Sequence, residues 1–305
     1  MIVTTLAFTS CARIAHVRDQ PVWDEIAAHA PDALLLLGDN VYLDRDDHDD
    51  PAELGADLER QWSAQLAEPH FAALLASLRS RGAPVLATWD DHDSFGDDRH
   101  GADLAPALVA AARAAFEKWA PGAGGAPRVY RRCDVADTRV LMLDARSYRS
   151  AHDAHGDRHG MLGAQQWAWL EAQLAEPGAR YTLVCNGSPL HEYGSEGWRA
   201  WPAARERMLG LLRGRPGVLF LAGDVHDNEL GSAGGAIEVI SSAVARRGKI
   251  LRWRLANYGL LELRADAAQI TLHGRQRKQR RSARIALADW RLPRGAATNR
   301  DRDEA

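Results

Sequence analysis

The stretch LLLLGDNVYLD, residues 34–44, leads from an apolar run directly into a group of polar side chains. Four consecutive leucines, with no polar residue between them, are typical of a strand that is buried on both faces. Gly38 permits the chain to turn sharply out of that strand, which leaves Asp39 at the edge of the sheet. Tyr42 follows three residues later, where its phenol oxygen can reach the same place. The stretch therefore predicts an α/β fold with reactive groups at a strand end.

Further apolar runs read as buried strands, and helical patterns separate them. Strands are expected at residues 2–8, 33–38, 84–89, 139–144, 181–186 and 217–224. Helices are expected at about residues 21–29, 53–80, 104–119, 164–175 and 199–213. From residue 236 onward the sequence is rich in strand patterns of a more antiparallel kind. This order predicts a mixed α/β fold in which two sheets are sandwiched between helices.

Polar residues follow these strands at the points where the strands are expected to end. Cys11 follows the first strand, Asp39 the second, residues 90–93 the third, and Asn186 and Asp224 the last two. In open α/β sheets, ligands bind at the carboxyl ends of the strands. We therefore expect these side chains to converge on one site.

The residue types at these strand ends are those that bind metal ions. Thiolate and phenolate, from Cys11 and Tyr42, are good ligands for a trivalent, iron-like ion, and carboxylates also suit harder divalent cations. The alternative is that Asp39 caps a turn and Tyr42 belongs to the core at a strand–loop junction. Because both the cysteine and the tyrosine are present, we favour the metal site.

The stretch GDVH, residues 223–226, repeats the arrangement of strand, glycine and aspartate. Asp224 and His226 are two positions apart, so in an extended segment they share one face and can bind one metal cluster. The alternative is a pair of polar loop residues after a strand. The amide oxygen of Asn186 can complete a calcium-like coordination sphere, although asparagine is also common in turns.

Charge is distributed unevenly along the chain. Residues 39–103 hold 16 acidic and 5 basic residues, a net charge of −11, which favours a site for hard cations. Residues 271–305 hold 10 basic and 4 acidic residues, a net charge of +6. The basic run at 275–284 can bind nucleic acid or anionic lipid, but it also fits the outer face of an edge strand, which we favour.

The composition is that of an ordinary globular protein, with 46% hydrophobic and 26% charged residues. No apolar run is long enough for a membrane span, and the N-terminal sequence MIVTTLAFTSCAR lacks the features of a secretory signal. The three cysteines are too few and too far apart for a disulfide framework. We therefore expect a cytoplasmic protein. The sequence does not indicate its oligomeric state.

Six motifs occur in a characteristic order. They are FTSCAR at 8–13, GDNVY at 38–42, WDDHD at 89–93, LDARSYR at 143–149, LGAQQWAWLEAQL at 162–174 and GDVH at 223–226. In this order the chain resembles the alkaline phosphatase D (PhoD-like) family of the calcineurin-like metallophosphoesterases. The resemblance implies a two-sheet αββα sandwich with mixed sheets. We assign residues 1–274 to this domain and residues 275–305 to a basic C-terminal strand and tail of the same domain.

The resemblance also implies a set of metal ligands and a reaction. An iron-like ion, Fe³⁺, would be held by Cys11, Asp39, Tyr42 and His226. Asp39 would bridge to a calcium-like site, Ca²⁺, which Asp91, Asn186 and Asp224 complete. A metal-bridged hydroxide would then attack phosphorus in a small phosphomonoester. The alternatives are a phosphodiesterase, such as a nuclease or phospholipid diesterase that the basic tail recruits to its substrate, and a non-catalytic metal- or phosphate-binding module.

Three further residues are expected to assist catalysis. His92 is the catalytic histidine that the resemblance implies; because adjacent side chains diverge, it is expected to act as a proton donor while Asp91 binds metal. Asp93 is expected to orient the imidazole of His92. Arg146 is a candidate for binding phosphate through charge-assisted hydrogen bonds, and a structural salt bridge is the alternative.

Overall fold

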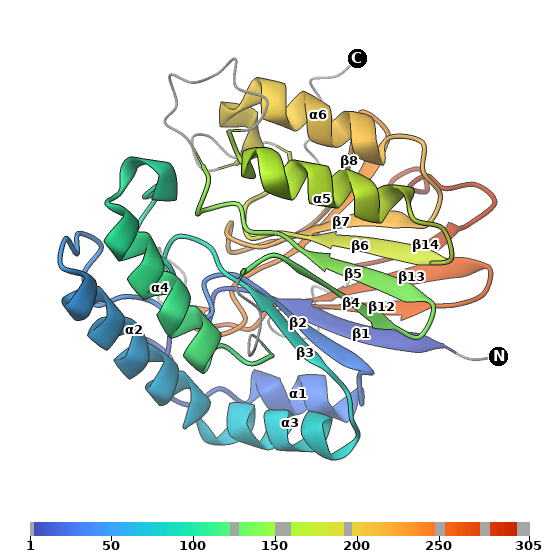
Figure 1. Ribbon diagram of the computed structural model, residues 1–305. Coiled ribbons are helices and arrows are strands. Elements are labelled where there is room, and N and C mark those ends of the chain that lie inside the picture. The colour runs from blue at the N-terminus through green and yellow to red at the C-terminus, as the bar shows by residue number, and fades with distance from the viewer. Residues whose placement is uncertain are drawn as a thin grey trace.

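The computed structural model describes residues 3–122, 128–149, 160–191, 197–247, 254–274 and 281–297. Two six-stranded sheets pack face to face, with helices on both outer faces (Figure 1). This is the α/β sandwich of two mixed sheets that the sequence predicts.

The first sheet combines three parallel strands with three antiparallel ones, in the order β14-β13-β12-β1-β2-β3. The parallel strands are β1 (Thr4–Thr9), β2 (Ala33–Leu37) and β3 (Val85–Thr88). The antiparallel strands are β12 (Tyr258–Leu263), β13 (Ala267–His273) and β14 (Arg281–Ala286). The antiparallel character expected beyond residue 236 is therefore found in this sheet.

The second sheet has the order β4-β5-β6-β7-β9-β8, with antiparallel strands only at its two edges. Its members are β4 (Arg131–Val135), β5 (Thr138–Met142), β6 (Tyr181–Cys185), β7 (Val218–Ala222), β8 (Asn228–Ala233) and β9 (Ala236–Ser241). A two-stranded ribbon of β10 (Arg246–Arg247) and β11 (Arg254–Leu255) lies outside both sheets.

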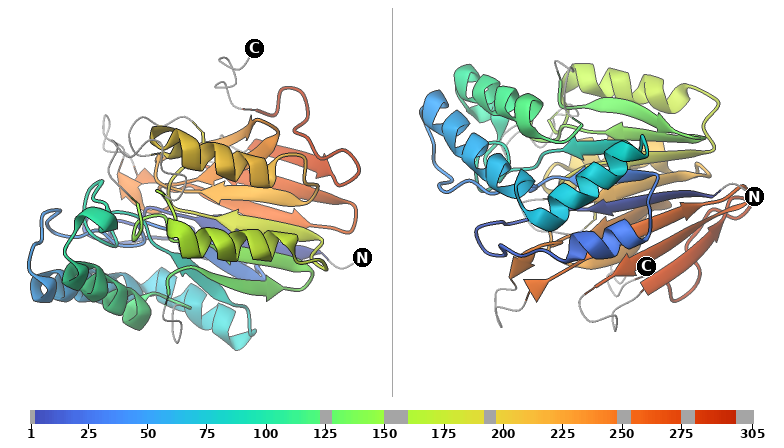
Figure 2. Two further views of the ribbon diagram at one scale, coloured as in Figure 1. Left: turned by 45° about the horizontal axis from the view of Figure 1, so that its top comes forward. Right: turned by 90° about the horizontal axis from the view of Figure 1, so that it is seen from below.

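Helices α1 (Val22–Ala28), α2 (Pro51–Leu66), α3 (Pro69–Ser80) and α4 (Pro106–Trp119) cover the first sheet. Helices α5 (Gly163–Ala175) and α6 (Pro202–Leu212) cover the second (Figure 2). Short 3₁₀ helices occur at Gly101–Asp103 and Trp198–Ala200. The four layers enclose three separate hydrophobic cores.

The leucine run of β2 shows why strands between two layers are apolar throughout. Leu34 and Leu36 belong to the core under the helices, whereas Leu35 and Leu37 belong to the core between the sheets. Successive side chains of a strand point to opposite faces, so both faces of β2 must be apolar. Each buried leucine stabilises the fold by roughly 1.5–3 kcal/mol through removal of its apolar surface from water.

One expectation for local structure was wrong, and one edge strand had no prediction. The single helix expected at residues 53–80 is two helices, because Pro69 has no N–H for an intrahelical hydrogen bond and sits at the start of α3 instead. Glu68 caps that helix by accepting a hydrogen bond from the Phe71 amide at 2.7 Å. Strand β4 was not expected, because its sequence RRCDV is that of a partly exposed edge strand rather than an apolar run.

The C-terminal part of the basic run lies where an edge strand was expected. Residues 281–284 belong to β14, which is the outermost strand of the first sheet, whereas residues 275–280 lie outside the described part of the chain. None of the described helices combines the length and the apolar character needed to cross a bilayer. The domain boundary at residue 274 and the cytoplasmic location remain predictions.

Candidate metal centre

Four candidate ligands occupy turns that directly follow strands β1, β2 and β7. Cys11, Asp39, Asp224 and His226 have φ angles of 59°, 51°, 68° and 57°, in the left-handed region that residues with a side chain rarely adopt. Gly38, before Asp39, has a φ of 85°, and a Cβ there would lie 2.7 Å from Cβ of Asp90. These turns carry the candidate ligands from both sheets to one edge of the sandwich.

The first group of ligands is centred on Asp39. The Cys11 thiol lies 3.3 Å from Oδ2 of Asp39, and the Tyr42 hydroxyl donates a 2.9 Å hydrogen bond to the same oxygen. The possible ligand atoms of Cys11, Asp39 and His226 all lie within 4.8 Å of one another. Sulfur, oxygen and nitrogen donors from three separate turns are thus within reach of a single ion.

A second group shares Asp39 with the first. The possible ligand atoms of Asp39, Asp91 and His92 also lie within 4.8 Å of one another. The expectation that the side chains of residues 91 and 92 diverge was therefore wrong. Residues 91–95 form a turn, in which the amides of Ser94 and Phe95 both donate to the Asp91 carbonyl, and adjacent side chains of a turn need not point to opposite faces.

Asn186 and Asp224 come from the second sheet. Asn186 is fully buried, and its side-chain amide donates to the Ser188 carbonyl at 2.7 Å. Within the described part of the chain its Oδ1 has no hydrogen-bond donor. Asp224 is also buried, and its backbone carbonyl lies 3.7 Å from the Cys11 thiol. Both residues are therefore near the edge at which the first sheet presents its own candidate ligands.

The candidate metal centre has the properties of a site for cations. Oδ1 of Asp39, Oδ1 of Asp91 and Oδ1 of Asn186 are buried acceptors without a hydrogen bond from any described residue. Burial raises the pKa of the Cys11, Asp39 and Tyr42 side chains. Cys11 raises the pKa of Asp39 further, Asp39 that of Tyr42, and Asp224 that of Cys11. Cations at this place would reverse the shifts and supply partners for the oxygens.

His92 lies beside the first group of ligands. Its ring packs against the Tyr42 ring with a centroid separation of 4.3 Å. Its two ring nitrogens lie 3.5 Å from carboxylate oxygens of Asp46 and Asp97. The side chain is 15% exposed, so it borders solvent while still touching a candidate ligand.

Asp93 is not placed as the sequence led us to expect. Its Oδ2 accepts hydrogen bonds from the Asn40 amide at 2.9 Å and from the Asn40 side chain at 2.6 Å, and its Oδ1 accepts one from the Asp90 amide at 2.6 Å. Burial raises the pKa of Asp93 to about 7 even though these donors oppose the shift. Asp93 thus links the turn after β3 to the turn after β2. The carboxylates next to the His92 ring are those of Asp46 and Asp97 instead.

Arg146 is placed as the structural salt bridge that was the alternative to phosphate binding. It is fully buried, and its Nε donates to Oδ1 of Asp90 at 2.5 Å. Its other nitrogens lie 3.6 Å from Asp91 and 3.4 Å from Asp98. Burial alone would raise the pKa of Asp91, but Arg146 and His92 outweigh it and lower that pKa below its usual range. Arg146 is therefore a positioning residue for the carboxylate of Asp91.

Two arginines that the sequence analysis missed lie against Tyr42. The guanidinium carbons of Arg13 and Arg246 are 5.1 Å and 4.9 Å from the centre of the Tyr42 ring. Arg246 also donates to the Tyr42 hydroxyl at 2.7 Å and contacts Nε2 of His226. Arg13 belongs to the motif FTSCAR and could have been noticed there, whereas no local sequence signal places Arg246 at the site.

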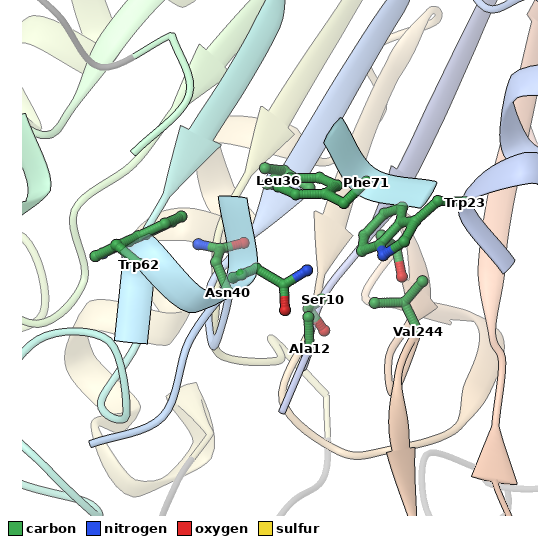
Figure 3. A pocket seen from close by; sticks show the side chains of 10 residues that line it. Ser10, Ala12, Trp23, Leu36, Asn40, Trp62, Phe71 and Val244 are labelled. Carbon is green, nitrogen blue, oxygen red and sulfur yellow. The ribbon is translucent and has the colours of Figure 1, made fainter. Parts of the chain in front are cut away.

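A separate cavity lies on the helix-facing side of the first sheet (Figure 3). Trp23, Trp62 and Phe71 form much of its wall, and all three belong to the hydrophobic core under the helices. Ser10 and Asn40, the sequence neighbours of Cys11 and Asp39, also line it. We assign this cavity to the core rather than to a substrate.

The chain is similar to known proteins both in sequence and in fold. The PhoD-like phosphatase family matches residues 6–248 of the chain. The fold is similar to the solved structure of PhoD, with a TM-score of 0.71, 16% sequence identity, and coverage of 98% of this chain and 72% of that one. It is also similar to GAP50, the anchor in the inner membrane complex of Plasmodium, with a TM-score of 0.51, 11% identity, and coverage of 92% and 86%. No curated protein sequence matches the chain.

Proposed function

Since the chain belongs to the PhoD-like phosphatase family, we propose that it hydrolyses phosphomonoesters at the candidate metal centre at the edge of its two sheets. The observation that carries this proposal is the overlap of two ligand groups on Asp39. A shared carboxylate between two groups of donors is what a site for two adjacent cations requires, and such sites are suited to phosphoryl transfer.

The ligand sets follow from the donors present. Cys11, Asp39, Tyr42 and His226 would hold an iron-like ion, because they combine a thiol and a phenol with a carboxylate and an imidazole. Asp39, Asp91, Asn186 and Asp224 would hold a calcium-like ion, because they offer oxygen donors only. When bound, such ions supply Lewis-acid stabilisation of charge on the phosphoryl oxygens and lower the pKa of water.

His92 is the residue that we propose to donate a proton to the leaving group. Its ring touches Tyr42 and borders solvent, so a substrate bound at the centre can reach it. Carboxylate oxygens of Asp46 and Asp97 lie 3.5 Å from its two nitrogens and hold the ring in its position beside Tyr42. Because one ring nitrogen of His92 also lies within 4.8 Å of Asp39 and Asp91 oxygens, a role as metal ligand is the competing assignment, and the experiment must separate the two.

The test compares His92→Ala with Asp91→Ala in metal content and in turnover of aryl phosphates. We expect His92→Ala to keep its metals and to lose about 10²–10⁴-fold in turnover, the usual range for a removed general acid. The loss should be smaller for esters of acidic phenols, which leave without protonation. Asp91→Ala should lose metal and fail on all esters alike.

Three results would count against these assignments. Loss of metal from His92→Ala would make His92 a ligand. An equal deficit for every phenol would show that His92 stabilises phosphoryl charge instead of donating a proton. Faster turnover of a bis-aryl ester than of the corresponding monoester by the unmodified protein would replace the monoesterase by a diesterase.

A further inference from the structure

Arg13 and Arg246 are brought together by backbone contacts between segments that are far apart in the sequence. The amide of Arg13 donates to the carbonyl of Ala245 at 3.0 Å, and Ala12 forms a parallel bridge with Ala245. The amides of Ala243 and Val244 both donate to the Ser10 carbonyl. The two arginines therefore occupy fixed neighbouring positions, one residue beyond a backbone bridge.

The two guanidinium groups differ from that of Arg146 in the partners that the described residues offer them. Among the described residues, neither Arg13 nor Arg246 forms an ion pair with a carboxylate, and the buried Nε of Arg13 has no hydrogen-bond acceptor. Their contacts are with the Tyr42 ring and, for Arg246, with the Tyr42 hydroxyl and His226. Arg146, by contrast, faces three carboxylates. Asp39 lies near enough to raise the pKa of Arg246, but the described residues show no ion pair between them. The two guanidinium groups beside Tyr42 are therefore available to an anion.

We propose that Arg13 and Arg246 form an anion-binding pair that holds the phosphoryl oxygens of a phosphomonoester. This inference rests on the proposed function, since it names the group that selects the substrate at the same centre. A phosphoryl group bound beside Tyr42 comes within reach of both guanidinium groups. Guanidinium binds phosphate through two parallel hydrogen bonds. A monoester, which carries two negative charges, gains more from two adjacent cations than a diester, which carries one.

Arg246 has a second contact that bears on the metal. Its guanidinium contacts the Tyr42 hydroxyl and Nε2 of His226, and we assign both of these atoms to the iron-like ion. Tyr42 and His226 would hold an ion only if Arg246 released them, and its guanidinium would then face the substrate. Removal of Arg246 should therefore leave metal uptake intact or make it tighter, while it weakens phosphate binding.

The test measures the binding of inorganic phosphate to the metal-loaded protein by calorimetry. We compare the wild type with Arg13→Gln, Arg246→Gln, the double variant, and Arg291→Gln as a control, because Arg291 is an exposed arginine whose partner is the neighbouring Asp289. We expect each single variant to bind phosphate about 10–100-fold more weakly, the range for hydrogen bonds to charged groups, and the control to be unchanged. kcat/KM for a monoester should fall by the same factor, and kcat/KM for a diester should fall less.

Lysine variants and metal titrations distinguish a loss of phosphate binding from poor folding and from loss of metal. Arg13→Lys and Arg246→Lys keep the charge over Tyr42 but lose the planar fork, so they should retain part of the phosphate affinity even if the glutamine variants fold poorly. Phosphate affinity equal to wild type in the metal-loaded double variant would overturn the inference, as would weaker metal uptake by Arg246→Gln. Arginine-dependent phosphate binding without any ester hydrolysis would refute the proposed function alone.

Discussion

Two pairs of arginines border the candidate metal centre, and their surroundings give them opposite roles. Arg146 and Arg149 are fully buried; Arg146 faces three carboxylates, while Arg149 donates to the Ala145 carbonyl and packs over the Trp201 ring. Arg13 and Arg246 lie over Tyr42 and have no carboxylate partner among the described residues. The first pair is therefore part of the folded scaffold, and the second pair is left for a ligand. A guanidinium near a phosphatase centre is thus informative only when its counter-charges are known.

The largest expected effect comes from the buried pair. Replacement of Arg146 by Met should lower the free energy of unfolding of the metal-free protein by about 3–5 kcal/mol, because Asp90 and Asp91 are then left buried without their cation. Urea denaturation in the presence of a chelator measures this loss. The control is Arg45→Met, whose ion pair with Asp47 is exposed on both sides and should leave stability unchanged within error. An equally small loss for Arg146→Met would remove the distinction between the two pairs.

A pH series examines the partly buried His191, whose positive charge can be removed without mutation. Glu238 accepts hydrogen bonds from the amides of Leu190 and His191 and pairs with the His191 ring. Burial disfavours the charged imidazole, but Glu238 outweighs it and raises the pKa of His191 to about 9.

Because the folded-state pKa of His191 lies above its ordinary value, the stabilisation is complete below about pH 6.5 and is lost as the pH rises through about 9. The total loss should be about 3 kcal/mol at most, measured by urea denaturation at several pH values. His191→Gln should lack this part of the pH dependence. A wild-type stability that stays level from pH 6.5 to 9.5 would show that the pair of His191 and Glu238 is not charged.

The smallest expected effect belongs to the other pair of arginines. Arg13→Gln should change the free energy of unfolding by only about 0.5–1 kcal/mol, the contribution of a cation–π contact at a partly exposed site. The same urea experiment applies, with Arg146→Met as the reference. If Arg13→Gln were as destabilising as Arg146→Met, Arg13 would be a structural residue, and its effect on phosphate binding would be indirect.

Much of the fold could be predicted from the sequence because its signals are local. The leucine run before Gly38 needs apolar neighbours on both faces, and the glycine at the strand end marks the turn that presents Asp39. The break at Pro69 is also a local signal, which the longer helical pattern around it obscured. Strand β4 carries charged residues on an exposed edge, so its sequence lacks the apolar pattern of a strand. Its backbone pairing with β5 makes it one.

The details of the site depended on contacts that no local pattern contains. Arg246 reaches Tyr42 because Ala12 and Ala245, 233 positions apart, form a backbone bridge. The turn at residues 91–95 brings the side chains of Asp91 and His92 close to each other and to Asp39. The assumption that adjacent side chains diverge does not predict this. Asp93 is bound by Asn40, whose position depends on the turn after another strand.

The four left-handed residues at the edge of the sandwich have a consequence for protein engineering. Cys11, Asp39, Asp224 and His226 each hold a backbone conformation that glycine adopts more easily, at a cost of order 1 kcal/mol for each residue. A selection that rewards heat resistance alone would therefore favour glycine at these positions and would discard the candidate ligands one by one. Improvement of this scaffold for high temperature requires that the screen demand metal retention at every round.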